Sequence, residues 1–460
     1  MNAAGQLSCR RPRRKILLPE SLPETMLAQL EILGTALLAV AKEHRDGSLA
    51  TLETEVLEVV RASLPRLLEE VLKCSTSDLQ PVYAHWQQSC PNCGERSEAQ
   101  SWRPRTVTTI CGKITFQRPC FVCDHCGHNF STVDRTLHLE QRTRLSQGLQ
   151  EWIIGLGAST SFAEATYWLE KLTGLEVSDE TIRQYTEQRG KAIEVAQQEA
   201  SEQVKKTLEP AAPLDPAPGM LVVETDAVKV RYLDGWLDVK IGLVAGHKDG
   251  EMVDPSYIAA RMSAEEFGPR LLAEAARRGA LEIVAWEGPV TQRGLAVLRE
   301  VLVLGDGAVW IWNLAAEHFG QRIEILDFYH ASEHLWAVAR ALYGEGTVAA
   351  QTWAGERTKE LLEKGVEPVL KGLAEAKAET TEASEVLRVE RGYFQSNATR
   401  MDYPKFREMG LPIGSGAVES SAKHLVQQRM KRSGCRWSEQ GAQGVLNVRS
   451  RLLSRLPLAS

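Results

Sequence analysis

The sequence predicts an α+β fold of several domains: N-terminal helices, a small β-unit with paired cysteines, a helical segment, and an α/β core. Three observations support this prediction. The chain has 460 residues, more than one domain usually holds. Two Cys-x2-Cys pairs flank a strand-rich stretch. After the proline-rich stretch 209–219, strand patterns with buried runs replace the helical periodicity.

The composition is that of a soluble globular protein, with 43% hydrophobic and 25% charged residues. No apolar run approaches the roughly 20 residues that span a bilayer, and the basic N-terminus is not followed by the apolar region of a secretory signal. We therefore expect a cytoplasmic protein with no membrane partner. The nine cysteines form an odd count, which argues against a disulfide framework.

The net charge of −6 does not indicate a nucleic-acid-binding protein, but the charge is unevenly distributed. Residues 400–460 contain 11 Lys and Arg against 4 Asp and Glu. Local patches rather than the total charge determine affinity for phosphates. The C-terminal region is therefore a candidate surface for nucleic acid.

The helical periodicity of residues 1–80 predicts a helical region, and residues 81–135 predict a zinc-ribbon domain. Two tight turns that each supply two thiolates suit the tetrahedral coordination of a structural zinc ion. Cys120 is a possible competing ligand, and reduced cysteines without a metal are the alternative. The predicted zinc ligands are Cys90, Cys93, Cys123 and Cys126.

Residues 136–208 predict a helical domain that contains a helix-turn-helix. One helix covers 162–172, Gly174 opens the turn, and Ser178 caps the second helix. A three-helix packing unit with no DNA contact fits the same pattern equally well. If the segment binds DNA, the side chains expected to face it are Thr181, Arg183 and Gln184.

The linker 209–219 precedes a core whose first part covers 220–336. Its order of three strands, a helix and further strands is that of an RNase H-like α/β fold. Residues 337–404 are mostly helical and polar, and we interpret them as a helical insertion. Residues 405–460 complete the core and carry the basic tail.

Several acids of the core occupy strand ends or a helix start, where a rigid element can hold a carboxylate open to substrate. Asp226 lies within the first strand, Asp306 follows a buried strand between two glycines, and Glu419 begins a late helix. Asp327 ends another strand three residues before His330. Converging carboxylates of this kind bind the divalent metals of phosphoryl transfer. We expect the nearby acids Glu224, Asp234 and Asp238 to be surface charges.

Long stretches of the chain resemble bacterial insertion-sequence transposases of the ISKra family and, more distantly, Mutator-type DDE transposases. The matching stretches are "CPNCG", "FVCDHCG", "LGDGAVWIWNLAAEHF", "ILDFYHASEHLW" and "GSGAVESSAKHLVQQRMKRSGCRWS". They extend from about residue 86 to 451. The resemblance implies an RNase H-like core with a DDE triad that cleaves and rejoins DNA at the ends of a mobile element.

The resemblance also implies the roles of the acids. Asp226 is the first acid, although "ETDAV" departs from the expected "DG", and Glu419 is the last. We take Asp306 as the middle acid because "DFYH" matches a later motif of the Mutator-type relatives. Asp327 is the second choice for that position, with His330 as a substrate-positioning group. The triad would bind catalytic Mg²⁺ or Mn²⁺.

The implied partners are double-stranded DNA, both the terminal inverted repeats of the element and the target, and further copies of the chain in a dimer or larger oligomer. The implied location is the nucleoid in the cytoplasm. The basic residues after Glu419 would lie along DNA phosphates: Lys423, Arg429, Lys431, Arg432 and Arg436.

Two other functions fit parts of the sequence. A DNA-binding regulator derived from a transposase would keep the zinc ribbon and helix-turn-helix without catalysis. A glycosidase would use a pair of carboxylates and is suggested by 11 tryptophans, but the zinc ribbon and basic tail argue against it.

Overall fold

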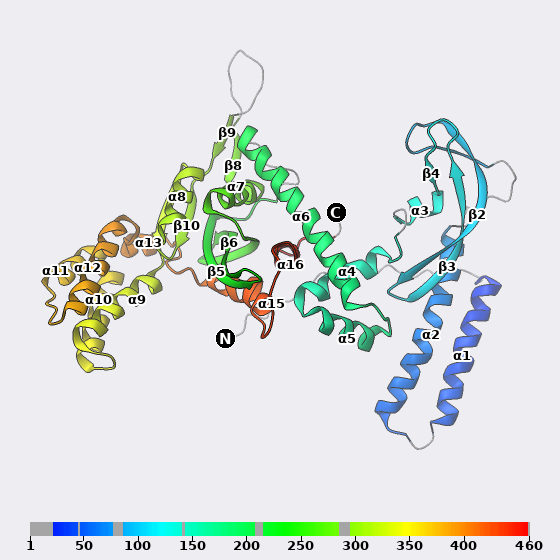
Figure 1. Cartoon of the computed structure of the whole chain (residues 1–460), viewed down its shortest axis with the longest axis horizontal. Coiled ribbons are helices and arrows are strands. Elements are labelled where there is room, and N and C mark those ends of the chain that lie inside the picture. Colours follow the sequence, from blue (N-terminus) through cyan, green and yellow to red (C-terminus); the bar gives the residue numbers. More distant parts are fainter. Residues whose placement is uncertain are drawn as a thin grey trace, which may run out of the picture. The chain divides into compact units, whose positions relative to one another are not determined.

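The computed structural model describes residues 22–44, 47–76, 86–139, 143–207, 215–284 and 295–458, and it confirms an α+β protein of more than one domain (Figure 1). The chain divides into two compact units. Unit 1 comprises residues 1–150 and 169–176, and unit 2 comprises residues 151–168 and 177–460. Residues 209–214, which are most of the predicted linker 209–219, lie outside the described residues.

Unit 1 begins with helices α1 (Glu24–Glu43) and α2 (Leu49–Ser75), which pack against each other. The Ser48 hydroxyl caps α2 by accepting the Thr51 N–H at 3.3 Å. Among the helices of the described residues, α1 alone has the length and mean hydropathy of a membrane span. We did not expect a helix of this apolar character, because the sequence contains no uninterrupted apolar run of that length. One such helix near the N-terminus is weak evidence, because soluble proteins contain helices of this kind.

An antiparallel sheet of four strands follows in unit 1, in the order of the chain. Its strands are β1 (Gln87–Ser89), β2 (Arg96–Thr109), β3 (Gly112–Val122) and β4 (Asn129–Phe130). The short helix α3 (Thr132–Thr136) contacts β3. The apolar core beneath this hairpin is small, consisting of Val107, Ile114, Phe116 and Val133 with partly buried neighbours. Such a core supplies little stabilisation for a sheet of this length.

Unit 2 is built on a mixed sheet of five strands in the order β11-β10-β5-β6-β7. Strands β5, β6 and β7 form an antiparallel meander, whereas β10 pairs in parallel with both β5 and β11. Every residue of β10 is buried, as expected for a parallel strand covered on both faces. The bounds are β5 Met220–Tyr232, β6 Gly235–Lys248, β7 Glu251–Ala260, β10 Val301–Gly305 and β11 Arg322–Leu326.

Helices connect and cover the strands of this sheet. Helix α7 (Ala264–Ala275) begins with a capping box in which Ser263 and Glu266 bond each other's backbone N–H. Residues 276–280 form the short helix η2, and β8 (Leu281–Val284) pairs with β9 (Leu295–Leu298). Helix α8 (Val309–His318) links β10 to β11.

Residues 328–408 are almost entirely helical, in agreement with the helical character predicted for 337–404. The helices are α9 Phe328–Tyr343, α10 Val348–Lys364, α11 Val366–Glu375, α12 Thr381–Ser396, η3 Ala398–Arg400 and α13 Tyr403–Glu408. The chain then forms α14 Gly416–Ser421, η4 Ala422–Gln427, α15 Gln428–Met430 and α16 Glu439–Leu453.

The segment predicted as a helical domain forms α4 (Gln147–Ser159), α5 (Phe162–Thr173) and α6 (Asp179–Thr207). Within unit 2, α6 packs closely on α16. A Cβ atom on Gly190 of α6 would lie 2.1 Å from the carbonyl oxygen of Gly444 in α16, so only glycine permits this approach. Helix α6 is thus fixed to the core along its middle turns.

Two arginines of the basic C-terminal region are buried, and one of them corrects a prediction. Arg429, expected on DNA phosphates, is 2% exposed; its guanidinium donates to the Gly157 carbonyl and packs against the rings of Phe162 and Trp437. Arg449 donates to the carbonyls of Leu425 at 2.6 Å and Ala158 at 2.7 Å. Burial lowers the pKa of each arginine to about 10.

We expect Arg449→Met to lower the free energy of unfolding of unit 2 by about 3 kcal/mol, because methionine fills the space but leaves several buried carbonyl oxygens without donors. Urea denaturation followed by tryptophan fluorescence measures the loss. The exposed Arg436→Met is the matched control and should change the free energy by less than about 0.5 kcal/mol. Equal stabilities of the two variants would show that the Arg449 bonds contribute nothing.

Candidate functional site

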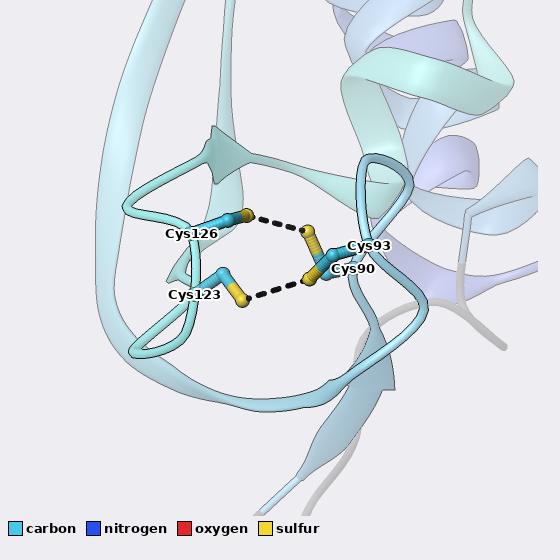
Figure 2. Close-up of side chains that lie close together, drawn as sticks. All are labelled: Cys90, Cys93, Cys123 and Cys126. Carbon is cyan, nitrogen blue, oxygen red and sulfur yellow. Dashed lines mark hydrogen bonds between the residues drawn. The ribbon is translucent and has the colours of Figure 1, made fainter.

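Four cysteine side chains of unit 1 gather at one place, between the β1–β2 and β3–β4 turns (Figure 2). Their sulfur atoms all lie within 4.8 Å of one another. The Sγ atoms of Cys90 and Cys126 are 3.6 Å apart, and those of Cys93 and Cys123 are 3.5 Å apart. Four sulfurs at such distances can bind a metal such as zinc, which prefers tetrahedral thiolate coordination.

Each cysteine pair is held by a tight turn of the same design. The Gly94 N–H donates to the Cys90 carbonyl at 2.9 Å, and the Gly127 N–H donates to the Cys123 carbonyl at 2.8 Å. Both glycines have positive φ, at +81° and +69°, the conformation that lets the chain turn back. The backbone N–H of Cys126 helps lower the pKa of the Cys123 thiol to about 6 and so favours the thiolate that binds metals.

Cys120, the possible competing ligand, does not belong to this group. It lies on β3, and its sulfur is 4.0 Å from the Arg118 carbonyl oxygen. The geometry therefore selects the four cysteines predicted from the two Cys-x2-Cys pairs.

The predicted acids of unit 2 lie on neighbouring elements. Asp226 is on the central strand β5, and Asp306 directly follows β10, the parallel neighbour of β5. Glu419 lies in the first turn of α14, a helix that contacts β5 and β6. Segments far apart in the sequence thus place three carboxylates at one side of the sheet.

These carboxylates interact electrostatically. Burial raises the pKa of Asp226, and the negative charges of Asp306 and Glu419 add to this effect. The Asp226 carboxylate accepts the Ala227 N–H at 2.6 Å, which opposes the shift. A raised carboxylate pKa beside like charges marks a place where a cation would be stabilised.

Glu224 is a fourth member of this group and was wrongly expected to be a surface charge. It is 1% exposed, and its Oε2 accepts the Val418 N–H at 2.7 Å, next to Glu419. Burial raises the pKa of Glu224 to about 8, with further contributions from the charges of Asp327 and Glu419. The sequence held a signal for this residue, because Glu224 and Asp226 share one face of a strand that is otherwise apolar.

Asp327 has a structural role in the geometry observed. It is 1% exposed and caps α9, with Oδ1 accepting the His330 N–H at 2.6 Å. Its Oδ2 accepts the Ser415 hydroxyl at 2.7 Å and also the Ser415 N–H. Among the described residues, the Asp306 carboxylate has one hydrogen-bond donor, the Ala308 N–H at 2.9 Å, which bonds Oδ1. Asp306 therefore has more capacity for a ligand than Asp327.

His330 lies in the first turn of α9, partly exposed, with Nδ1 3.5 Å from a Glu333 carboxylate oxygen. When protonated, His330 stabilises the ionised form of Asp226 and so lowers the pKa of Asp226, which places it in the same electrostatic group. Its ring contacts that of His334, which stacks on Tyr393 with ring centres 3.8 Å apart. The Tyr393 hydroxyl donates to the Asp306 carbonyl at 3.0 Å and thereby links α12 to this acid.

The donor types fit a hard cation such as Mg²⁺, which prefers carboxylate oxygens. Within the described residues, only the four cysteines offer three or more ligand atoms within 4.8 Å of one another. A metal held by Asp226, Asp306 and Glu419 thus requires their side chains to turn toward it. Glu419 is exposed and free to do so.

The side chains predicted to face DNA on α6 are engaged with their own helix. Arg183 pairs with Glu180 and Glu187, the Gln184 amide donates to Glu180, and the Thr181 hydroxyl contacts the Ser178 cap at 2.9 Å. The predicted cap at Ser178 accepts the Thr181 N–H at 3.2 Å. These contacts satisfy the polar groups without a ligand, and only Gln184 is exposed.

The basic residues after Glu419 separate into three groups. Arg429 is buried, and Arg432 forms a two-bonded ion pair with Glu164, with one N···O distance of 2.9 Å. Lys423, Lys431 and Arg436 are exposed. These last three side chains therefore remain available to contact phosphates.

We expect the stability of unit 2 to fall as the pH rises from about 4.5 to about 8, because an unfolded Glu224 ionises near 4.5 and the buried one only near 8. Glu224→Gln removes this pH dependence, because the glutamine side chain does not ionise. The variant should match the wild type at pH 5 and exceed it by about 1–3 kcal/mol at pH 8 in urea denaturation without added divalent metal. Asp238→Asn, whose side chain is 51% exposed, is the control. Stability curves that stay parallel across this pH range would contradict the assignment.

Residues 54–211 match the model of a family described as an uncharacterised protein family, UPF0236. The chain is also similar to a UPF0236 protein in the vanSb 3′ region of Streptococcus gallolyticus. The two are 24% identical over 415 residues, which cover 86% of this chain and 81% of the relative. The family match includes the four cysteines and α6, and the similarity to the relative extends over most of both chains.

Proposed function

We propose that this relative of the UPF0236 proteins is a metal-dependent DNA transposase of the DDE type, as its resemblance to the ISKra family implies. The observation that carries the proposal is the electrostatic group formed by Asp226, Asp306 and Glu419. Three distant segments contribute one carboxylate each, in the order expected of a DDE triad. Carboxylates whose pKa is raised by burial and by neighbouring negative charges are found preferentially at functional sites.

The sheet supports an RNase H-like core. A three-stranded antiparallel meander is extended by two parallel strands beside its first strand, with the first acid on that first strand and the second acid after its parallel neighbour. This strand order is the one we expect for the RNase H-like fold, and α14 brings the third acid to the same side.

In the proposed mechanism, Asp226, Asp306 and Glu419 would hold the divalent cations. Bound Mg²⁺ or Mn²⁺ would stabilise the charge that develops on the phosphodiester and lower the pKa of the attacking water or 3′-hydroxyl. Gly307, with φ of +99°, lets the loop after β10 turn tightly beside Asp306. Glu224 and Asp327 act through the backbone: they bond Val418 and Ser415 and so fix the start of α14, which carries Glu419.

Nucleic-acid contacts would come from the exposed Lys423, Lys431 and Arg436, and from the zinc-ribbon and helix-turn-helix segments. The substrate would be double-stranded DNA carrying the terminal inverted repeats of the element, followed by target DNA. Two element ends must meet for strand transfer, which favours a homodimer or larger assembly.

The test uses the purified full chain and a labelled duplex taken from the genomic flank of its gene, with a shuffled duplex as control. We expect Mg²⁺- or Mn²⁺-dependent cleavage that exposes a 3′-hydroxyl at the element end and spares the shuffled duplex. Binding of the flank duplex without cleavage under any metal would instead favour the DNA-binding regulator. Absence of both binding and cleavage would refute both functions.

A further inference from the structure

A groove of about 1010 Å³ lies on unit 1, and no particular residue of its lining has been given a DNA contact above. Its walls come mainly from β2, β3, β4, α3 and the segment before α4. The groove begins where the small apolar core under the hairpin ends. On the same face of the two strands as Val107 and Phe116, the next positions are Arg105, Arg103 and Arg118.

The lining is strongly positive. Arg103 and Arg118 lie directly opposite each other across β2 and β3, and Arg105 is two residues further along the same face. Arg135 of α3 and Arg144 add two more positive charges, against one acid, Asp134. Like charges in opposite positions destabilise a hairpin unless anions compensate them.

The single acid compensates only part of this charge. The Asp134 carboxylate bonds Arg105 at 2.6 Å and also Arg118, within a largely buried trio. The structure describes no ion pair for Arg103, Arg135 or Arg144, and all three are exposed. Within the described part of the chain, these three guanidinium groups therefore carry positive charge that no carboxylate offsets.

The shape and lining of the groove indicate the class of ligand. Small-molecule sites are mostly apolar and enclosed, with volumes of roughly 300–1,000 Å³. This groove is open, and five of its lining residues are arginines that come from several elements. Arginine forks match phosphate oxygens, and a row of them matches a ligand with successive phosphates rather than a single anion.

We infer that this arginine groove, defined by Arg103, Arg105, Arg118, Arg135 and Arg144, binds the phosphate backbone of double-stranded DNA independently of sequence. Arg105, Arg118 and Asp134 form its fixed floor, and Arg103, Arg135 and Arg144 make the phosphate contacts. The inference concerns DNA binding alone and does not depend on cleavage by the carboxylates of unit 2.

The test measures the affinity of the full chain for a labelled duplex of arbitrary sequence at several salt concentrations. The triple variant Arg103→Gln, Arg135→Gln, Arg144→Gln should bind about tenfold or more weakly and lose about 2–3 from the slope of log K against log salt, since each phosphate contact contributes about 0.9. The corresponding triple Lys variant should retain most of the slope because it keeps the charges. Arg66→Gln on α2, with a side chain 71% exposed, should leave the slope unchanged.

The results of this experiment either support or overturn DNA binding by the arginine groove. A lower slope in the Gln variant, with zinc content and circular dichroism unchanged, supports it whether or not the protein cleaves DNA. Unchanged affinity and slope in a variant that still binds DNA, or no binding by the wild type, overturns it. Displacement of the duplex by single-stranded RNA of equal length at a much lower concentration would also overturn it and assign the groove to RNA.

Discussion

Removal of metal from the four-cysteine cluster, or the substitution Cys123→Ser, is expected to unfold the four-stranded sheet of unit 1. The apolar cluster under the hairpin contains four buried residues, and Phe121 is a further buried residue of β3; each contributes about 1.5–3 kcal/mol. A structural zinc site contributes about 10–16 kcal/mol to folding in small metal-binding modules. The free energy lost with the metal should therefore exceed the stabilisation that the apolar core alone provides.

Hydrogen exchange read by mass spectrometry measures this effect locally. Amides of residues 86–130 should lose protection when a zinc chelator is added or when Cys123 is replaced, while the strands of unit 2 keep theirs. Cys120→Ser is the matched control, because Cys120 lies on the same sheet but outside the cluster, and it should retain about one zinc per chain. Full protection of residues 86–130 in the metal-free protein would disprove a stabilising metal.

The second large effect is a loss of DNA cleavage on substitution of the predicted catalytic acids. Asp306→Asn and Glu419→Gln should each reduce DNA-end cleavage by about 10³-fold or more, because each removes a charge that would hold the catalytic cation. Asparagine at 306 can still accept the Ala308 N–H, so the fold should be retained. Gel-shift binding and the melting temperature, measured beside cleavage, show whether the loss is chemical.

Asp327→Asn is the comparison that identifies the middle acid. Its carboxylate bonds the backbone of His330 and Ser415, so the substitution should lower the free energy of unfolding by about 1–3 kcal/mol and reduce cleavage less than Asp306→Asn does. If Asp327→Asn abolishes cleavage with unchanged stability and Asp306→Asn does not, the triad must be reassigned to Asp327.

The sequence predicted well those features of the fold that depend on a few neighbouring residues. The cysteine pairs, the cap at Ser178 and the α+β class follow from turn chemistry, capping and periodicity over a few residues. The electrostatic interaction of Asp226 with Asp306 and Glu419 could only be inferred from strand order and resemblance, since it depends on pairing across the sheet.

The two clear errors have one cause, which is burial by distant segments. Arg429 looked like one charge in a basic run, but Phe162 and Gly157 bury it. A helical pattern was available: Ala422, Leu425, Val426, Arg429 and Met430 recur at three- and four-residue spacing and form one buried stripe. Glu224 was likewise assigned to the surface because a hairpin was assumed to expose one face, whereas α14 covers that face.

The close contact between Gly190 and Gly444 has a consequence for how the protein is made. Helix α6 is synthesised long before α16, and more than two hundred residues separate them. At about 5–20 residues per second, the ribosome leaves α6 without its partner for tens of seconds. During this interval the buried face of α6 is open to chaperones and proteases, and a premature stop codon before residue 439 leaves it permanently open. Nascent chains that lack α16 should therefore be degraded, so that translation through the last helix acts as a checkpoint for accumulation of the protein.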